Sequence, residues 1–75
     1  MQKYIMQTLD AIEQRVSEIS EALAEARIYR MSNIEQDPDF VNTDEYTDSM
    51  QVSIDLANIT NELLSAHQTI FKYLQ

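Results

Sequence analysis

Two stretches of the sequence carry apolar residues at alternating steps of four and three, and this repeat limits the fold more than any other feature. The first stretch contains Ile5, Leu9, Ile12, Val16, Ile19, Leu23 and Ala26. The second contains Val52, Leu56, Ile59, Leu63, Ala66, Ile70 and Tyr73. This spacing aligns apolar side chains along one face of a helix and is typical of coiled coils. The sequence therefore predicts an all-α fold built from two long helices.

The connection between the helices is expected around the single proline of the chain, Pro38. Proline lacks an amide hydrogen and disfavours helical backbone at the preceding residue, here Asp37. We therefore predict a first helix over about 2–32, an acidic connector over about 33–42 and a second helix over about 43–74. A connector of this length favours antiparallel neighbours, so the whole chain of 75 residues is predicted to be one coiled-coil-like helical-hairpin domain.

Several residues near the connector match patterns that start or end helices. Asn33 is a candidate C-terminal stop for the first helix. Asp37 is followed by proline, a pair that opens short helical turns. Asn42 or Thr43 is expected to cap the second helix, and Asn42 with Glu45 has the spacing of a capping box.

In an antiparallel hairpin, residues that face each other have a constant sum of residue numbers. With helices ending near residue 32 and starting near residue 43, this sum is predicted to be about 75. The two apolar stripes then pair as Ile5 with Ile70, Leu9 with Ala66, Ile12 with Leu63, Val16 with Ile59, Ile19 with Leu56 and Leu23 with Val52. Beside the turn, Ala26 would face Ser49 and Arg30 would form an ion pair with Glu45. Because both stripes repeat every seven residues, about one offset in seven would pair them this way, so this register is a hypothesis.

The second helix carries a further apolar stripe outside this predicted seam. Its residues are Met50, Ala57, Leu64 and Phe71, with Tyr46 and Leu74 beside them. One hairpin of this size buries a small core, and an exposed apolar stripe several turns long usually marks an association surface. We therefore expect self-association, most simply a dimeric four-helix bundle. The alternatives are ordinary bundle core and a groove that receives a helix of another protein.

The negative charge of the chain is concentrated at the predicted turn. Residues 33–48 contain no base and carry −6 of the net charge of −8. This acidic tip consists of Glu35, Asp37, Asp39, Asp44, Glu45 and Asp48, with Phe40 among them. Such a cluster suits docking of a basic protein surface, or is explained by helix capping and a solvated loop alone. A calcium loop is disfavoured because Val41 and Asn42 stand where a ligand and a glycine are needed.

Composition argues against several function classes. The chain has no Cys and no Gly, which excludes a disulfide scaffold, a Cys-ligated zinc site and glycine-rich phosphate loops. The single histidine, His67, is expected to flank the seam, so we predict no enzyme activity, no cofactor and no metal site. The acidic charge disfavours direct nucleic-acid binding. No apolar run is long enough for a membrane span, and a cytoplasmic protein is expected.

These observations favour a non-enzymatic protein–protein interaction module, such as a small acidic adaptor, chaperone or assembly factor. It would act through the apolar stripe of the second helix and the acidic tip, on itself and on an unidentified protein partner. The alternative is an acidic inhibitor from a phage or mobile element that mimics nucleic acid and blocks a nucleic-acid-binding protein. A mimic should spread its charges like a phosphate backbone, whereas here they cluster at one end.

Overall fold

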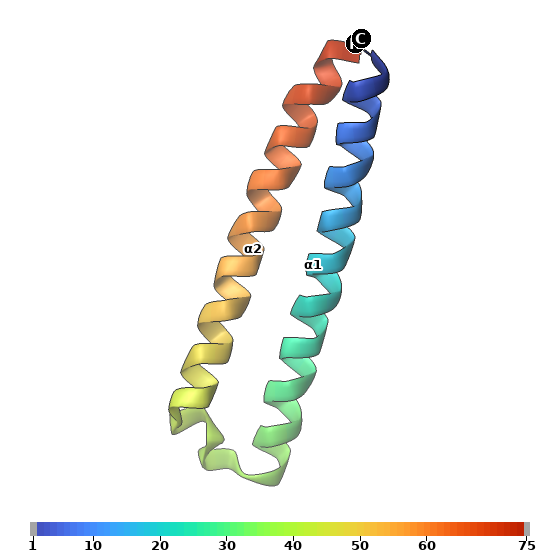
Figure 1. Cartoon of the computed structure of the whole chain (residues 1–75). Helices are drawn as coiled ribbons and strands as arrows, with labels where there is room; N and C mark the ends of the chain where they lie inside the picture. Colours follow the sequence, from blue (N-terminus) through green and yellow to red (C-terminus); the bar gives the residue numbers. More distant parts are fainter. Residues whose placement is uncertain (1, 75) are drawn as a thin grey trace.

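The computed structural model describes residues 2–74 and shows an antiparallel helical hairpin (Figure 1). Its elements are α1 (Gln2–Gln36), the 3-10 helix η1 (Pro38–Asn42), α2 (Asp44–Phe71) and the short 3-10 helix η2 (Lys72–Leu74). The molecule is a rod of 54 × 14 × 14 Å with the chain ends together at one end and the connector at the other. The predicted all-α hairpin is confirmed for the described residues.

The first helix runs four residues beyond its predicted end at residue 32. Asn33 does not stop it: this residue is half-buried within α1, and its side-chain amide donates to the carbonyl oxygen of Tyr29 at 2.8 Å. The helix ends at Gln36 because Asp37, which precedes proline, takes an extended conformation with φ −150° and ψ 101°. Proline, and not asparagine, therefore sets the length of α1.

The connector is held by two side-chain caps. The Asp37 carboxylate accepts a hydrogen bond from the Asp39 amide at 3.1 Å and opens η1, which confirms the predicted short turn at Pro38. The Thr43 hydroxyl accepts from the Tyr46 amide at 3.2 Å and starts α2. Thr43 is thus the N-cap, and the alternative assignment of the cap to Asn42 is wrong.

The helices pack in a different register from the predicted one. The buried and half-buried residues of the two helices align as the pairs Ile5–Leu74, Leu9–Ile70, Ile12–His67, Val16–Leu63, Ile19–Thr60, Leu23–Leu56, Ala26–Ser53, Arg30–Ser49 and Asn33–Tyr46, and the hydrogen bonds between Arg30 and Ser49 anchor this alignment. Each pair sums to 79, whereas the sequence hypothesis gave 75. The difference of four equals the extra turn of α1, because the helix ends on either side of the connector fix which residues face each other.

This shift leaves the α1 stripe as predicted and changes the α2 stripe. The α1 residues of the predicted repeat all lie in the seam, and Leu56, Leu63 and Ile70 of α2 join them. The other predicted seam residues of α2 are exposed: Val52, Ile59, Ala66 and Tyr73. Their places are taken by Ser49, Ser53, Thr60 and His67. The predicted α2 seam was therefore right for Leu56, Leu63 and Ile70 and wrong for the other four residues.

The hairpin encloses very little core. Among the described residues only Leu9 and Phe40 are buried apolar side chains, at 4% and 7% exposure. The chain exposes 5882 Å², whereas a compact monomer of 8.7 kDa exposes about 4,700 Å². Two helices side by side leave about 1,100 Å² more surface in water than a typical fold of this mass.

Candidate interaction surfaces

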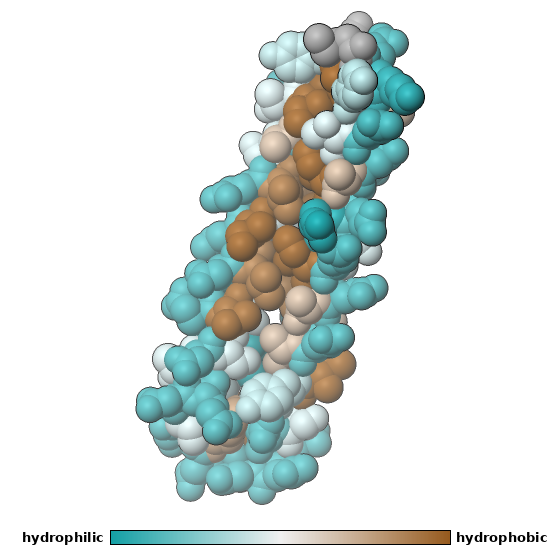
Figure 2. All heavy atoms as spheres, in the orientation of Figure 1, coloured by the Kyte–Doolittle hydropathy of each residue, from teal (hydrophilic) through white to brown (hydrophobic). Residues whose placement is uncertain are grey.

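The α2 helix exposes apolar side chains on both sides of the seam. We call one row the Val52 flank, formed by Val52, Ile59, Ala66 and Tyr73. The other row is the Leu64 flank, formed by Met50, Ala57, Leu64 and Phe71. Exposure reaches 52% at Val52, 47% at Leu64 and 76% at Tyr73. Figure 2 shows one face of the hairpin, where apolar side chains form a band along the line between the helices and polar side chains cover the edges and tip.

The two flanks lie on opposite faces of the hairpin. The Tyr29 hydroxyl donates to the Glu45 carboxylate at 3.1 Å, and Glu45 is one heptad before Val52, so Tyr29 and the Val52 flank share a face. On the other face, Leu64 shares a shallow groove of about 270 Å³ with Glu13 and His67. The predicted surface included Tyr46 and Leu74, but both lie half-buried in the seam.

His67 lies within the seam, although the sequence placed it beside the seam. Its Nε2 is 3.5 Å from the Glu13 carboxylate, and the imidazole is only 26% exposed. The ring stacks on that of Phe71, with centroids 6.4 Å apart and planes at 11°. Nε2 is buried and makes no hydrogen bond to any described residue. The described chain offers His67 one weak carboxylate contact and one aromatic neighbour, which is the environment of a structural side chain.

Arg30 organises the seam near the tip. Its Nη1 donates to the Ser49 carbonyl at 3.0 Å, to the Ser49 hydroxyl at 2.9 Å and to the Ser53 hydroxyl at 2.8 Å. The predicted ion pair with Glu45 does not form, because the shifted register puts Ser49 opposite Arg30 and the Glu45 carboxylate accepts from Tyr29. Arg30 therefore bonds to neutral acceptors on α2 instead of to the predicted carboxylate.

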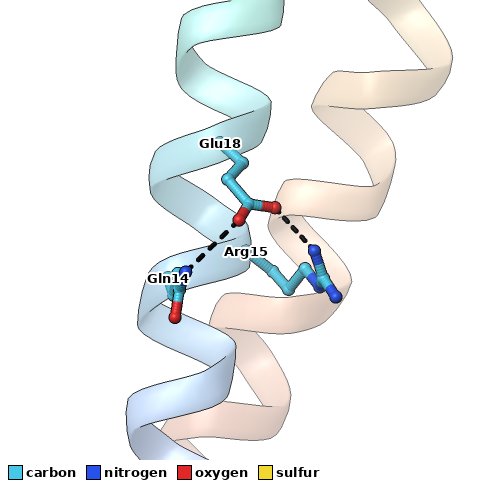
Figure 3. A network of polar contacts seen from close by, with 3 residues as sticks. All are labelled: Gln14, Arg15 and Glu18. Atoms are coloured by element: carbon cyan, nitrogen blue, oxygen red, sulfur yellow. Dashed lines mark hydrogen bonds and ion pairs between the residues drawn. The ribbon is translucent and has the colours of Figure 1, made fainter.

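A charged network lies on α1 near its middle. The Arg15 guanidinium donates to the Glu18 carboxylate at 2.6 Å, and the Gln14 amide reaches the same carboxylate at 3.5 Å (Figure 3). Arg15 is two heptads before Tyr29, so it lies on the face of the Val52 flank. Both charged side chains are open to solvent, at 70% and 48% exposure, so the pair is available to a second molecule.

The acidic tip is built around a buried aromatic residue. Phe40 packs edge-on against Tyr29 and Tyr46, with ring centroids 6.0 and 6.1 Å away. It therefore anchors η1 and is not displayed for a partner, in contrast to its predicted place on the surface of the tip. The six acids of the tip are all exposed: Glu35, Asp37, Asp39, Asp44, Glu45 and Asp48.

One of these acids changes the ionisation of a neighbour. The hydrogen bond from the Tyr29 hydroxyl to the Glu45 carboxylate raises the pKa of Tyr29 above its ordinary value of 10.0, with smaller contributions from desolvation and from the negative charge of Glu45. The bond favours the protonated phenol because only that form can donate. It links the last turns of α1 to the first turn of α2.

Two further properties of the described residues concern metal binding and membrane spanning. No three acidic or histidine side chains in residues 2–74 lie close enough to hold a metal ion. Neither helix in the described range is long and apolar enough to cross a membrane. The surfaces with distinctive chemistry are the two apolar flanks of α2 and the acidic tip.

The sequence prediction placed the Val52 flank in the seam instead of on the surface, and it paired Arg30 with Glu45 instead of with Ser49 and Ser53. A signal for Arg30 was present, since it continues the α1 stripe seven residues after Leu23. No comparable signal exists for the Val52 flank, because its residues continue an apolar repeat and exposure depends on the register.

Comparison with models of protein families, with curated proteins and with solved structures found nothing that matches this chain.

Proposed function

We propose that this chain is a non-enzymatic protein–protein interaction module, a small acidic adaptor, chaperone or assembly factor that associates with itself and with a protein partner. The observation that carries the proposal is the pair of exposed apolar flanks on α2. Single exposed apolar residues are common, but rows that follow a helix for several turns are unusual on a monomer. Such rows favour burial against another helix.

The exposed area supports self-association. A specific interface buries about 800 Å² on each partner. The surface that the hairpin exposes in excess of a compact monomer is about 1,100 Å², which is enough for one such interface. A dimeric four-helix bundle would give each α2 a second helix neighbour.

The acidic tip gives the module a second surface of different character. Its six carboxylates are exposed, and the buried Phe40 anchors the η1 turn that lies among them. A cluster of negative charge attracts a basic protein surface and speeds the encounter with it. We propose that the apolar flanks hold the assembly together and that the tip selects the partner.

Sedimentation equilibrium tests the proposed self-association. At tens of micromolar we expect a mass of twice the chain mass of 8.7 kDa. Two double variants introduce charges into one flank each, and their masses show which flank the dimer uses. One carries Leu64→Glu with Phe71→Glu, and the other carries Val52→Glu with Ile59→Glu. Ile28→Glu is the matched control, because Ile28 is apolar and 63% exposed on α1. A wild-type chain that sediments as a monomer at this concentration would rule out self-association.

Salt dependence separates the adaptor from the nucleic-acid mimic. Helix-in-groove binding of a captured partner should persist in about 1 M salt, where the screening length falls to about 3 Å. Binding that is lost at high salt, and lost also when Asp37, Asp39 and Asp44 are changed to Asn, would instead favour the acidic inhibitor.

A further inference from the structure

The Val52 flank matches itself when a second molecule is turned end for end. Its four residues are spaced by seven, so reversing their order places Val52 opposite Tyr73 and Ile59 opposite Ala66. We propose that a second copy of this chain packs on the Val52 flank in antiparallel orientation, with one acidic tip at each end of the bundle. This inference rests on the proposed self-association and specifies its surface and its direction.

The symmetry of such a dimer fixes which helices meet. A two-fold axis perpendicular to the rods places α2 against the second copy's α2 and α1 against its α1. The axis crosses α2 midway between Ile59 and Ala66. Because facing residues across the seam sum to 79, the same level on α1 lies between Arg15 and Glu18.

The charged pair at this level is complementary to itself. Arg15 of one copy lies opposite Glu18 of the other, and the reverse pair lies on the other side of the axis. The two side chains already bond within one chain at 2.6 Å, so the dimer joins two ion pairs into a closed network of four alternating charges. The apolar residues of α2 fix the position of the axis, and the charged pair of α1 matches it independently.

The charges at the two ends of the rod also favour the antiparallel arrangement. The tip carries six acids, whereas Lys3 and Lys72 lie at the other end. Turned end for end, the second copy brings both lysines to the level of residues 49–53, next to the tip residue Asp48. A parallel dimer would instead bring both tips together, and like charges at that density repel.

Exposed carboxylates border both flanks: Glu13 lies beside the Leu64 flank, and Asp55 and Glu62 lie three to four residues from members of the Val52 flank. The faces differ in a second respect. On the face of the Val52 flank Arg15 is bonded to Glu18, and this pair can be shared with a second copy, whereas the contact of Glu13 is the weaker one to His67 at 3.5 Å. We therefore assign the dimer contact to the Val52 flank and leave the Leu64 flank to a different protein.

Disulfide trapping tests the orientation, since the natural chain has no cysteine. The probes are Val52→Cys and Tyr73→Cys, made as separate proteins, then mixed at equal concentration and oxidised. A disulfide needs Cα atoms within about 7 Å. In the antiparallel dimer two Val52 positions are about 31 Å apart along the axis, so we expect each variant alone to stay unlinked and the mixture to form a covalent heterodimer.

Each other outcome has a distinct meaning. If Val52→Cys alone forms a covalent dimer, the copies are parallel and the inference is wrong, while the proposed self-association stands. If neither the single variants nor the mixture cross-link but wild-type chain sediments as a dimer, another surface is used and the inference is equally wrong. A monomeric wild-type chain would remove both proposals.

Charge substitutions provide a second readout that needs no cross-link. Val52→Glu with Ile59→Glu should weaken dimerisation at least 100-fold, because each apolar side chain is buried twice in a two-fold interface. Ile28→Glu should leave the dimer dissociation constant within about twofold. The helical circular dichroism signal of both variants, recorded at protein concentrations below the dimer dissociation constant, verifies that the hairpin still forms. If the dimer is lost in the variant with Leu64→Glu and Phe71→Glu but not in the variant with Val52→Glu and Ile59→Glu, the assignment of the dimer contact to the Val52 flank is wrong.

Discussion

The two helices of this hairpin use their apolar residues differently. Every member of the α1 repeat is buried or half-buried toward α2, whereas four of the seven residues of the α2 repeat are exposed to water. The seam of α2 instead includes Ser49, Ser53, Thr60 and His67. Thus α2 covers the apolar repeat of α1, although α1 exposes other apolar side chains such as Ile28, and α1 covers only part of the apolar repeat of α2. The same heptad spacing can therefore be fully paired on one helix and partly unpaired on the other.

The energetic consequence of this asymmetry is large. A half-buried aliphatic seam stabilises a hairpin only modestly, and chains of this length rarely fold on one small core. Burying the open rows of α2 adds roughly 25 cal/mol for each Å² removed from water. Association is therefore expected to contribute to the stability of the fold as well as to its function.

The largest contrast is expected between a seam residue and a flank residue of the same type. Leu9→Ala should lower the free energy of unfolding by about 2–4 kcal/mol, since Leu9 is 4% exposed and its removal leaves a cavity. Leu64→Ala, at a site 47% exposed, should cost less than about 1 kcal/mol in the monomer. Urea denaturation at a monomeric concentration measures both. Equal costs would mean that the seam is not where the structure has it.

The polar seam near the tip should give an intermediate effect. Arg30→Ala removes three hydrogen bonds from the half-buried groups of Ser49 and Ser53, and we expect a loss of about 1–3 kcal/mol in unfolding free energy. Arg27→Ala, in which an exposed arginine one turn away is removed, is the matched control and should cost less than about 0.5 kcal/mol. A double-mutant cycle with Ser53→Ala shows whether the bonds carry the effect. Additive costs would argue against them.

The smallest effect concerns the bond between Tyr29 and Glu45. Because the pKa of Tyr29 is raised in the folded chain, the bond stabilises the fold below pH 10, and this contribution disappears as the pH rises through the folded pKa. Ultraviolet titration of wild type minus Tyr29→Phe should show a phenol that ionises above pH 10. Glu45→Ala should move this component back toward 10, and an unchanged curve would contradict the assigned cause.

Much of the fold was predictable because it depends on local chemistry. The heptad spacing identified both helices, and the proline after Asp37 identified the turn. The register was not predictable because it depends on where α1 ends. Asn33 was a reasonable stop by composition, but it stays within α1, where its side-chain amide donates to the Tyr29 carbonyl oxygen. A four-residue error at one helix end moved every predicted pair by one turn.

The error in the register made part of the predicted interaction surface wrong. The exposed positions of Met50, Ala57, Leu64 and Phe71 agree with their expected place outside the seam, and their role as an interface remains a prediction. The Val52 flank had been paired with α1. Two stripes with the same repeat cannot be distinguished by apolar spacing, and the polar groups that select one register, Arg30 with Ser49 and Ser53, act only once the helices are side by side.

An intrachain disulfide can show whether α1 packs against only the middle of the apolar surface of α2. Ala26→Cys is combined with Ser53→Cys in one variant and with Ser49→Cys in another, and both variants are oxidised at a monomeric concentration. We expect rapid closure of the first variant, because Ala26 aligns with Ser53 in the seam, and little or no closure of the second. Preferential closure with Ser49→Cys would mean that facing residues sum to 75, that the Val52 flank is buried against α1 and that the register described above is wrong.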